Sequence, residues 1–175
     1  LRRVPRDWEV VEAKRIFAQR KDRAEKGQDQ LTASQAHGII SQKEYMSKQG
    51  VRVVIVEKNH DILKQVEAGD FVISMRSFQG GLEYSRIRGS ISSAYVMLYS
   101  LKDIDDEYFK YLFKSSGYIQ MFQSTSNLVR DGQAMRYANF IQVPLPLPPK
   151  KEQSKIAASL DKENVYARKK KKKIQ

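Results

Sequence analysis

The chain has 175 residues, of which 41% are hydrophobic and 10% aromatic, a composition that favours a folded domain and excludes an intrinsically disordered one. It contains no cysteine, which excludes disulfides and thiolate metal sites and fits a reducing cytoplasm, and no apolar run approaches the roughly 20 residues of a membrane helix. The net charge is +12 and falls only to +6 when the six basic residues 168–173 are left out, so the body itself favours a polyanionic partner.

The first 50 residues are predicted to hold one helix and otherwise irregular chain. Residues 5–11 are expected to be extended, with Trp8 as a buried anchor. Residues 12–25 are predicted to be helical because their apolar side chains recur on one helical face. The polar composition of residues 26–50 favours a loop and irregular structure.

The middle of the chain is predicted to be mostly β-structure. Gly80 and Gly81 indicate the turn of a hairpin, because glycine adopts positive φ at little cost, and residues 83–88 are predicted to return from it as a strand. Residues 61–68 are expected to be a short helix or turn. Runs of β-branched or apolar residues predict further strands at 51–56, 71–75 and 93–99.

The last third combines helices with a proline-rich strap, residues 143–149. Acidic residues 105–107 suit the start of a helix, and a second short helix is predicted after Gly117. Alternating prolines lack N–H donors, so the strap is predicted to be an extended edge segment that leads into a helix at Pro149. The whole pattern predicts an α+β fold.

Two parts of this fold are expected. Residues 1–149 are predicted to form one globular domain with a mixed β-sheet flanked by short helices. Residues 150–175 are predicted to begin a C-terminal spacer or dimerisation helix that carries a basic tail.

Motifs for catalysis and metal binding are mostly absent. The sequence has no G-x-x-x-x-G-K-[ST] phosphate loop, and two histidines without any cysteine do not favour a zinc site. Glu12 and Lys14 match half of a nuclease motif in form, but the segment is predicted to be helical and a surface charge pair is favoured. We therefore expect no enzymatic activity, no cofactor and no metal.

Basic and amide side chains gather at predicted loops and strand ends, where a scaffold can present them to DNA. Arginine and glutamine make bidentate contacts with guanine and adenine edges, whereas lysines suit phosphates. Arg86 and Arg88 are two apart, so a strand would place both on one face. For any single arginine, a solvated charge or an ion pair remains open. The candidate DNA-binding residues are Lys43, Lys48, Arg76, Ser77, Gln79, Arg86, Arg88, Arg130, Gln133 and Arg136.

Five segments of the chain resemble the target-recognition domain of the specificity subunit of type I restriction-modification enzymes. They occur in the same order as in that family. The strongest is the strap, Val-Pro-Leu-Pro-Leu-Pro-Pro, followed by Glu152-Gln153 and Leu160-Asp161-Lys162. The resemblance runs from Pro5 to about Leu160. The five segments are 4–10, 69–81, 89–95, 104–114 and 143–162.

The resemblance implies a non-catalytic, cytoplasmic domain that reads one half of a bipartite sequence in double-stranded DNA. Its implied partners are methyltransferase subunits and, in the full enzyme, a translocating nuclease subunit. The strap would lead into a long helix that sets the distance between two recognition domains and docks the methyltransferase subunits. No membrane is implied.

The chain departs from the family pattern in two respects. It holds one recognition domain instead of two, and the apolar spacing of the C-terminal helix stops after Asp161. A half-size subunit that pairs with itself and a piece of a two-domain subunit both explain this. A stand-alone nuclease or methyltransferase fragment and a non-specific basic RNA-binding protein are the alternatives to the family assignment.

Overall fold

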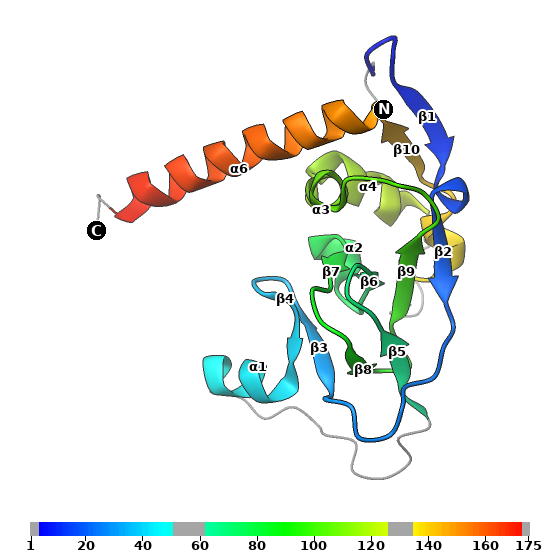
Figure 1. Ribbon diagram of the computed structural model, residues 1–175, viewed down its shortest axis with the longest axis vertical. Coiled ribbons are helices and arrows are strands. Elements are labelled where there is room, and N and C mark those ends of the chain that lie inside the picture. The colour runs from blue at the N-terminus through cyan, green and yellow to red at the C-terminus, as the bar shows by residue number, and fades with distance from the viewer. Residues whose placement is uncertain (1–3, 51–61, 126–134, 173–175) are drawn as a thin grey trace.

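The computed structural model describes residues 4–50, 62–125 and 135–172 (Figure 1). None of the helices in these ranges has the length and apolar character needed to cross a membrane. The elements are, in chain order, β1 (Glu9–Glu12), η1 (Ala13–Arg15), β2 (Phe17–Arg20), β3 (Leu31–Ser34), β4 (Gly38–Ser41), α1 (Gln42–Gln49), β5 (Lys64–Val66), β6 (Phe71–Ile73), α2 (Ser77–Gly80), β7 (Glu83–Tyr84), β8 (Gly89–Ile91), β9 (Val96–Ser100), α3 (Asp106–Lys114), α4 (Ser116–Ser124), α5 (Tyr137–Phe140), β10 (Pro144–Leu147) and α6 (Lys150–Lys172).

The strands form small antiparallel sheets, and the predicted α+β class is confirmed. A four-stranded sheet in the order β2-β9-β6-β7 lies at the centre, with two-stranded sheets β1–β10, β3–β4 and β5–β8 around it. All named strand pairs among the described residues are antiparallel, so the single mixed sheet expected from the sequence is corrected to four separate ones. Short strands and frequent turns prevent one continuous sheet.

The proline-rich strap forms a strand that pairs with the N-terminal strand β1. Its residues 144–147 form β10, which pairs with β1 from Glu9 opposite Leu147 to Glu12 opposite Pro144. A two-stranded sheet has only edges, so the missing proline N–H groups disrupt no inner ladder. As predicted, the strap is extended and α6 begins directly after Pro149.

The main core is built from aromatic rings on the central sheet and the helices that cover it. Phe17 of β2 lies edge-on to Phe71 of β6 and to Phe109 of α3, with centroids 5.6 Å and 5.2 Å away. Phe113 of α3 and Phe140 of α5 complete the group, and all five rings are almost fully buried. A smaller cluster lies between the central sheet, the β3–β4 hairpin and β8.

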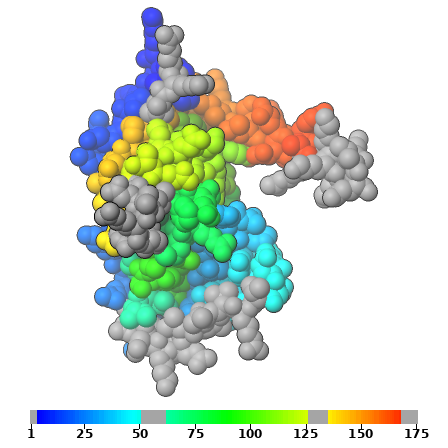
Figure 2. Space-filling model, turned by 180° about the vertical axis from the view of Figure 1, so that it is seen from behind, coloured from blue at the N-terminus to red at the C-terminus, as the bar shows by residue number. Residues whose placement is uncertain are grey.

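The C-terminal helix α6 is fastened to the domain by polar contacts from α3 and from the N-terminal segment. The indole N–H of the half-buried Trp8 donates to Glu152 Oε1 at 3.1 Å, and Tyr111 Oη donates to Asp161 Oδ1 at 2.5 Å. The helix continues past Asp161 to Lys172, although the apolar spacing ends there. Viewed from behind, α6 projects away from the body on the same side as α1 (Figure 2).

Several predicted elements are confirmed, and these have strong local signals. Strands β6 and β9 lie within or beside the predicted 71–75 and 93–99, and β7 returns from β6 as expected. Helix α3 follows Asp105, whose carboxylate accepts the Tyr108 amide at 3.1 Å, and α4 is the predicted second helix. The predicted strand 51–56 lies outside the described residues.

Other predictions are wrong where tertiary pairing overrides local pattern. Residues 12–25 form no long helix but the end of β1, η1 and β2, because β2 pairs with β9 along its whole length. The supposed irregular region 26–50 contains the β3–β4 hairpin and α1, and residues 64–66 form β5. The Gly80–Gly81 turn is the end of the short helix α2, and the strand predicted over residues 83–88 ends at Tyr84, with β8 beginning at Gly89.

Candidate nucleic-acid interface

A groove of about 350 Å³ opens between the β3–β4 turn, α1 and the turn that follows β6. Its walls carry amides, an arginine and aromatic rings, so it offers both hydrogen-bond donors and apolar surface. The groove is lined by Thr32, Ala33, Ser34, Gln35, Ala36, Tyr45, Gln49, Ser74, Met75, Arg76, Glu83 and Tyr95. A second, larger groove of about 640 Å³ lies between the β3–β4 turn, α3 and α6.

The turn after β6 is held by hydrogen bonds between two buried serines and the backbone. The Ser74 amide donates to Ser77 Oγ at 2.8 Å, and the Arg76 amide donates to Ser74 Oγ at 3.3 Å. The Ser77 amide in turn donates to the Ser74 carbonyl at 3.1 Å. Because the serines hold the backbone, Met75 and Arg76 occupy defined positions at the groove, and both side chains are exposed.

Helix α2, which follows this turn, rests on α3, on α4 and on the β3–β4 hairpin. The Lys114 ammonium donates to the Gly80 carbonyl at 3.0 Å, and Gln123 Nε2 donates to the Phe78 carbonyl at 2.5 Å. The Gln35 side chain packs so closely on Gly80 that a Cβ there would lie 2.3 Å from Gln35 Nε2. The groove walls are therefore in mutual contact.

Helix α1 carries two of the predicted lysines, and neither of them lines the groove. Ser41 caps the helix by accepting the Glu44 amide at 3.1 Å, which sets its start. Lys43 is 82% exposed with its ammonium 3.9 Å from Asp29, and Lys48 pairs with Glu44 at 2.6 Å, one helical turn away. Such exposed pairs are weak and exchange readily for other anions.

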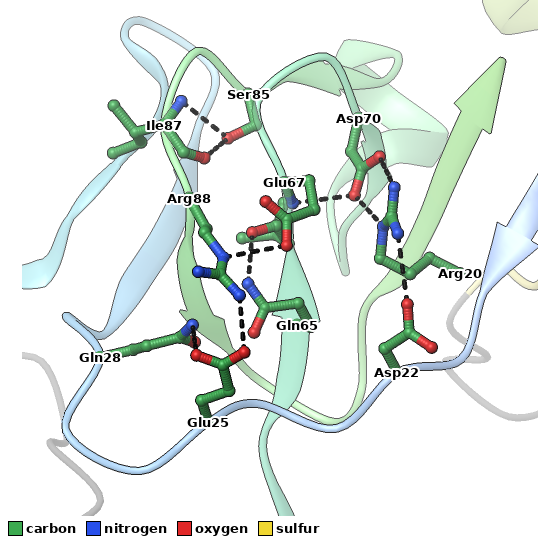
Figure 3. Close-up of polar contacts among 11 residues, drawn as sticks. Arg20, Asp22, Glu25, Gln28, Gln65, Glu67, Asp70, Ser85, Ile87 and Arg88 are labelled. Carbon is green, nitrogen blue, oxygen red and sulfur yellow. Dashed lines mark hydrogen bonds and ion pairs between the residues drawn. The ribbon is translucent and has the colours of Figure 1, made fainter.

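Arg86 and Arg88 do not share the face of one strand, because β7 ends at Tyr84. Arg86 pairs with Glu107 at 2.7 Å. Arg88 is held by two carboxylates, Glu25 at 2.7 Å and Glu67 at 3.0 Å (Figure 3). Both arginines thus already have acidic partners within the domain.

A neighbouring ion pair is largely buried. The Arg20 guanidinium donates twice to Asp70, at 2.7 Å and 3.0 Å, and once to Asp22 at 3.2 Å (Figure 3). Asp70 Oδ2 also accepts the Glu67 amide at 3.0 Å. Burial raises the pKa of Asp70 in spite of these hydrogen bonds. The pair joins β2 to the turn before β6 and so supports the sheet that carries the groove.

The family model of the type I restriction modification DNA specificity domain matches residues 5–175. The chain belongs to this family. A comparison with curated protein sequences gave no match. The family is that of the DNA specificity domain of type I restriction-modification systems.

Solved structures share the fold of this chain. The crystal structure of the HsdS subunit from Thermoanaerobacter tengcongensis is similar over 94% of this chain and 40% of its own, with a TM-score of 0.56 and 16% identity. A structure from work on complex assembly and conformational transition of the type I R-M system is similar over 96% of this chain and 41% of its own, with a TM-score of 0.57 and 17% identity. The specificity domain thus spans about two fifths of the length of these chains.

The predicted contact residues do not all meet at the groove of this specificity domain. Arg136 is exposed at the start of α5, where its amide donates to Asn139 Oδ1 at 2.9 Å, and it does not line the groove. Arg130 and Gln133 lie outside the described residues. Ser77 is 1% exposed, and its hydroxyl accepts the Ser74 amide within the turn. Gln79, on α2, is exposed.

Sequence reasoning missed the residues of the groove that come from the first 50 positions. Gln35 lies at the β3–β4 turn, and Tyr45 and Gln49 lie on α1, in the region predicted to be irregular. The sequence did contain a signal for α1. Ser41 is followed three residues later by Glu44, a spacing that is typical of the start of a capped helix. The part of the chain that the structure describes holds no cluster of three or more acidic or histidine side chains suited to a metal ion.

Glu83, which lines the groove, makes the stability of the domain depend on pH. Its carboxylate is 4% exposed and hydrogen-bonds to Lys114, but burial outweighs this and raises its pKa above the ordinary value of 4.5. The folded state therefore binds more protons than the unfolded state just above that pH, so stability falls as the pH rises through the folded pKa. We expect Glu83→Gln to match the wild type in acid and to become the more stable protein as the pH rises through this window. Urea unfolding at a series of pH values measures this, and a constant difference between the two proteins would contradict it.

Proposed function

We propose that the groove bounded by the β3–β4 turn, α1 and the Ser74–Ser77 turn reads base edges in one half of a bipartite DNA target. One observation carries this proposal: Arg76 is exposed on a hydrogen-bonded turn, and its side chain makes no hydrogen bond or ion pair within the described ranges of the chain. Two amides, those of Gln35 and Gln49, line the same groove. Arginine and glutamine are the side chains that read guanine and adenine bidentately.

Phosphate contacts are assigned to two exposed lysines of α1, the helix that also supplies Tyr45 and Gln49 to the groove. Lys43 and Lys48 project from α1, and their exposed ion pairs are readily exchanged for phosphate oxygens. Arg130, Gln133 and Arg136 are proposed as a second set of contacts. Arg86 and Arg88 do not line this groove, so they are not assigned a base contact; their ion pairs are exposed like those of the two lysines.

The wider role is proposed from the family and from the shape of the chain. The domain would act in the cytoplasm by placing methyltransferase subunits, and in the full enzyme a nuclease subunit, at the sequence it reads. Helix α6 would serve as the spacer, since it is a 23-residue helix that projects from the body (Figure 1). The second half-site would be read by another recognition domain, supplied either by a second copy of this chain or by the rest of a longer one.

The proposal is tested by selection from a random duplex library, with the domain bound to its methyltransferase partner. One short enriched half-site is expected. Equal binding of random duplex DNA and RNA would contradict sequence-specific recognition. Cleavage or methyl transfer by the purified chain with Mg²⁺ or S-adenosylmethionine would instead favour a catalytic fragment.

The lysine assignment predicts a change in salt dependence. Removing a lysine that neutralises one phosphate should reduce the slope of log affinity against log salt by about 0.9. Lys43→Gln and Lys48→Gln should each produce this change, weaken binding to all sequences equally and leave the selected half-site unchanged. Fluorescence anisotropy over a salt series measures the slopes. Lys14→Gln is the matched control, because Lys14 is exposed and pairs with Glu12 at 3.3 Å but lies on η1 and not on α1.

A further inference from the structure

Met75 is an unusual residue for the edge of this groove. It lies two residues after the end of the buried strand β6, yet it is 46% exposed and belongs to neither of the buried hydrophobic clusters. Covering a large exposed apolar side chain with a ligand is favourable, because it removes apolar surface from water. Ala36 and Tyr95 also line the groove and extend this apolar surface. The groove is thus suited to an apolar group on the molecule it binds.

Arg76, the next residue, offers the complementary polar chemistry. Arg20, Arg86 and Arg88 are each held by at least one carboxylate, whereas Arg76 makes no such pair within the described ranges of the chain. The carboxylate that lines the same groove, Glu83, is engaged by Lys114. Among the described residues, no acceptor occupies any of the five guanidinium donors of Arg76, which suits this side chain to bind a ligand.

Met75 and Arg76 are consecutive residues that both line the groove, and the Cα spacing of consecutive residues is close to the rise between stacked bases. Consecutive Cα atoms are about 3.8 Å apart, and successive bases along one DNA strand rise by about 3.4 Å. The hydrogen bonds from Ser74 and Ser77 hold this turn in place before any ligand binds, so little ordering is needed on binding. Two neighbouring side chains on such a turn can reach two neighbouring base pairs.

We propose that Arg76 and Met75 together read a guanine and an adjacent thymine in the major groove. Arg76 donates to guanine O6 and N7, and Met75 packs against the C5 methyl group of the thymine. The inference rests on the proposed function of the groove and adds the identity of two adjacent bases and the chemical groups that are read.

The test uses single-atom changes in the selected half-site, with the domain in its methyltransferase complex. Each guanine is replaced in turn by 7-deazaguanine, which lacks the N7 acceptor, and each thymine by uracil, which lacks the methyl group. Wild type should lose affinity at one guanine and at one neighbouring thymine. Arg76→Ala should bind the unmodified half-site about 5- to 150-fold more weakly and be insensitive to the deazaguanine at that position. Met75→Ala should bind about 4-fold more weakly and be insensitive to the uracil.

Three further variants separate base reading from general effects. Arg76→Lys keeps the charge but not the two-donor fork, so it should retain the salt dependence of the wild type and lose the response to deazaguanine. Arg15→Ala and Leu101→Ala remove an exposed cation and a 52% exposed apolar residue outside the groove, and both should respond like the wild type.

The possible outcomes distinguish this inference from the function on which it rests. A domain that enriches no half-site overturns the proposed function and this inference together. A domain that enriches a half-site, but whose Arg76 and Met75 variants respond to every replacement as the wild type does, overturns this inference alone. Responses at two positions that are not neighbours also overturn it, because one turn could not then read both bases.

Discussion

Replacing Gly81 with alanine is expected to lower the free energy of unfolding by about 3–5 kcal/mol. Gly81 has φ +72°, a conformation that side-chain-bearing residues rarely adopt, and an added Cβ would lie 1.9 Å from the Phe113 carbonyl oxygen. Neither the end of α3 nor the turn can move away easily, because Phe113 is fully buried in the aromatic core. Urea unfolding followed by circular dichroism measures the decrease.

Gly117→Ala is the matched control for this substitution. Gly117 lies in the first turn of α4, has no atom within 4 Å of an added Cβ and does not have positive φ. Alanine should therefore leave stability unchanged or raise it by up to about 1 kcal/mol, because it favours the helix. A Gly81→Ala protein as stable as the Gly117→Ala protein would contradict the close packing of α2 against α3.

Arg20→Ala is expected to cost about 3–5 kcal/mol at neutral pH, because it leaves the Asp70 carboxylate buried without its cation. The Asp70 side chain is only 2% exposed, and its remaining hydrogen bond comes from the Glu67 amide. Burial already raises the pKa of Asp70, and removal of Arg20 should raise it further. Protonation then removes the buried charge, so the destabilisation should shrink as the pH is lowered. Thermal or urea unfolding at neutral and acidic pH measures both effects.

Two further variants test whether the buried charge is the cause. Asp70→Asn combined with Arg20→Ala should recover part of the stability at neutral pH and should show less pH dependence than Arg20→Ala. Arg86→Ala, which breaks the exposed pair with Glu107, should cost at most about 1 kcal/mol. If Arg20→Ala lowers the free energy of unfolding by no more than Arg86→Ala does at neutral pH, burial of the Asp70 carboxylate does not cause the predicted loss of stability.

The parts of the fold that were predicted correctly have signals within a few residues of chain. Asp105 at a helix start and the alternating prolines after Val143 each restrict the local backbone, so α3 and the strap were recognisable. Residues 12–25 carry a helical pattern but form β1, η1 and β2, because pairing of β2 with β9 and burial of Phe17 outweigh a modest helix propensity. No local signal reports a partner strand that lies about 80 residues away.

The order of five motifs was sufficient to place this chain in the type I specificity family, because prolines, glycines and helix-start residues act through the local backbone. Residue type alone also marked Arg76 as a candidate contact. Only the tertiary structure brings Gln35 and Gln49 to the same groove as Arg76, and only it shows that Arg88 is already held by Glu25 and Glu67. Both results depend on contacts between residues far apart in the chain, which the packing of the folded domain decides.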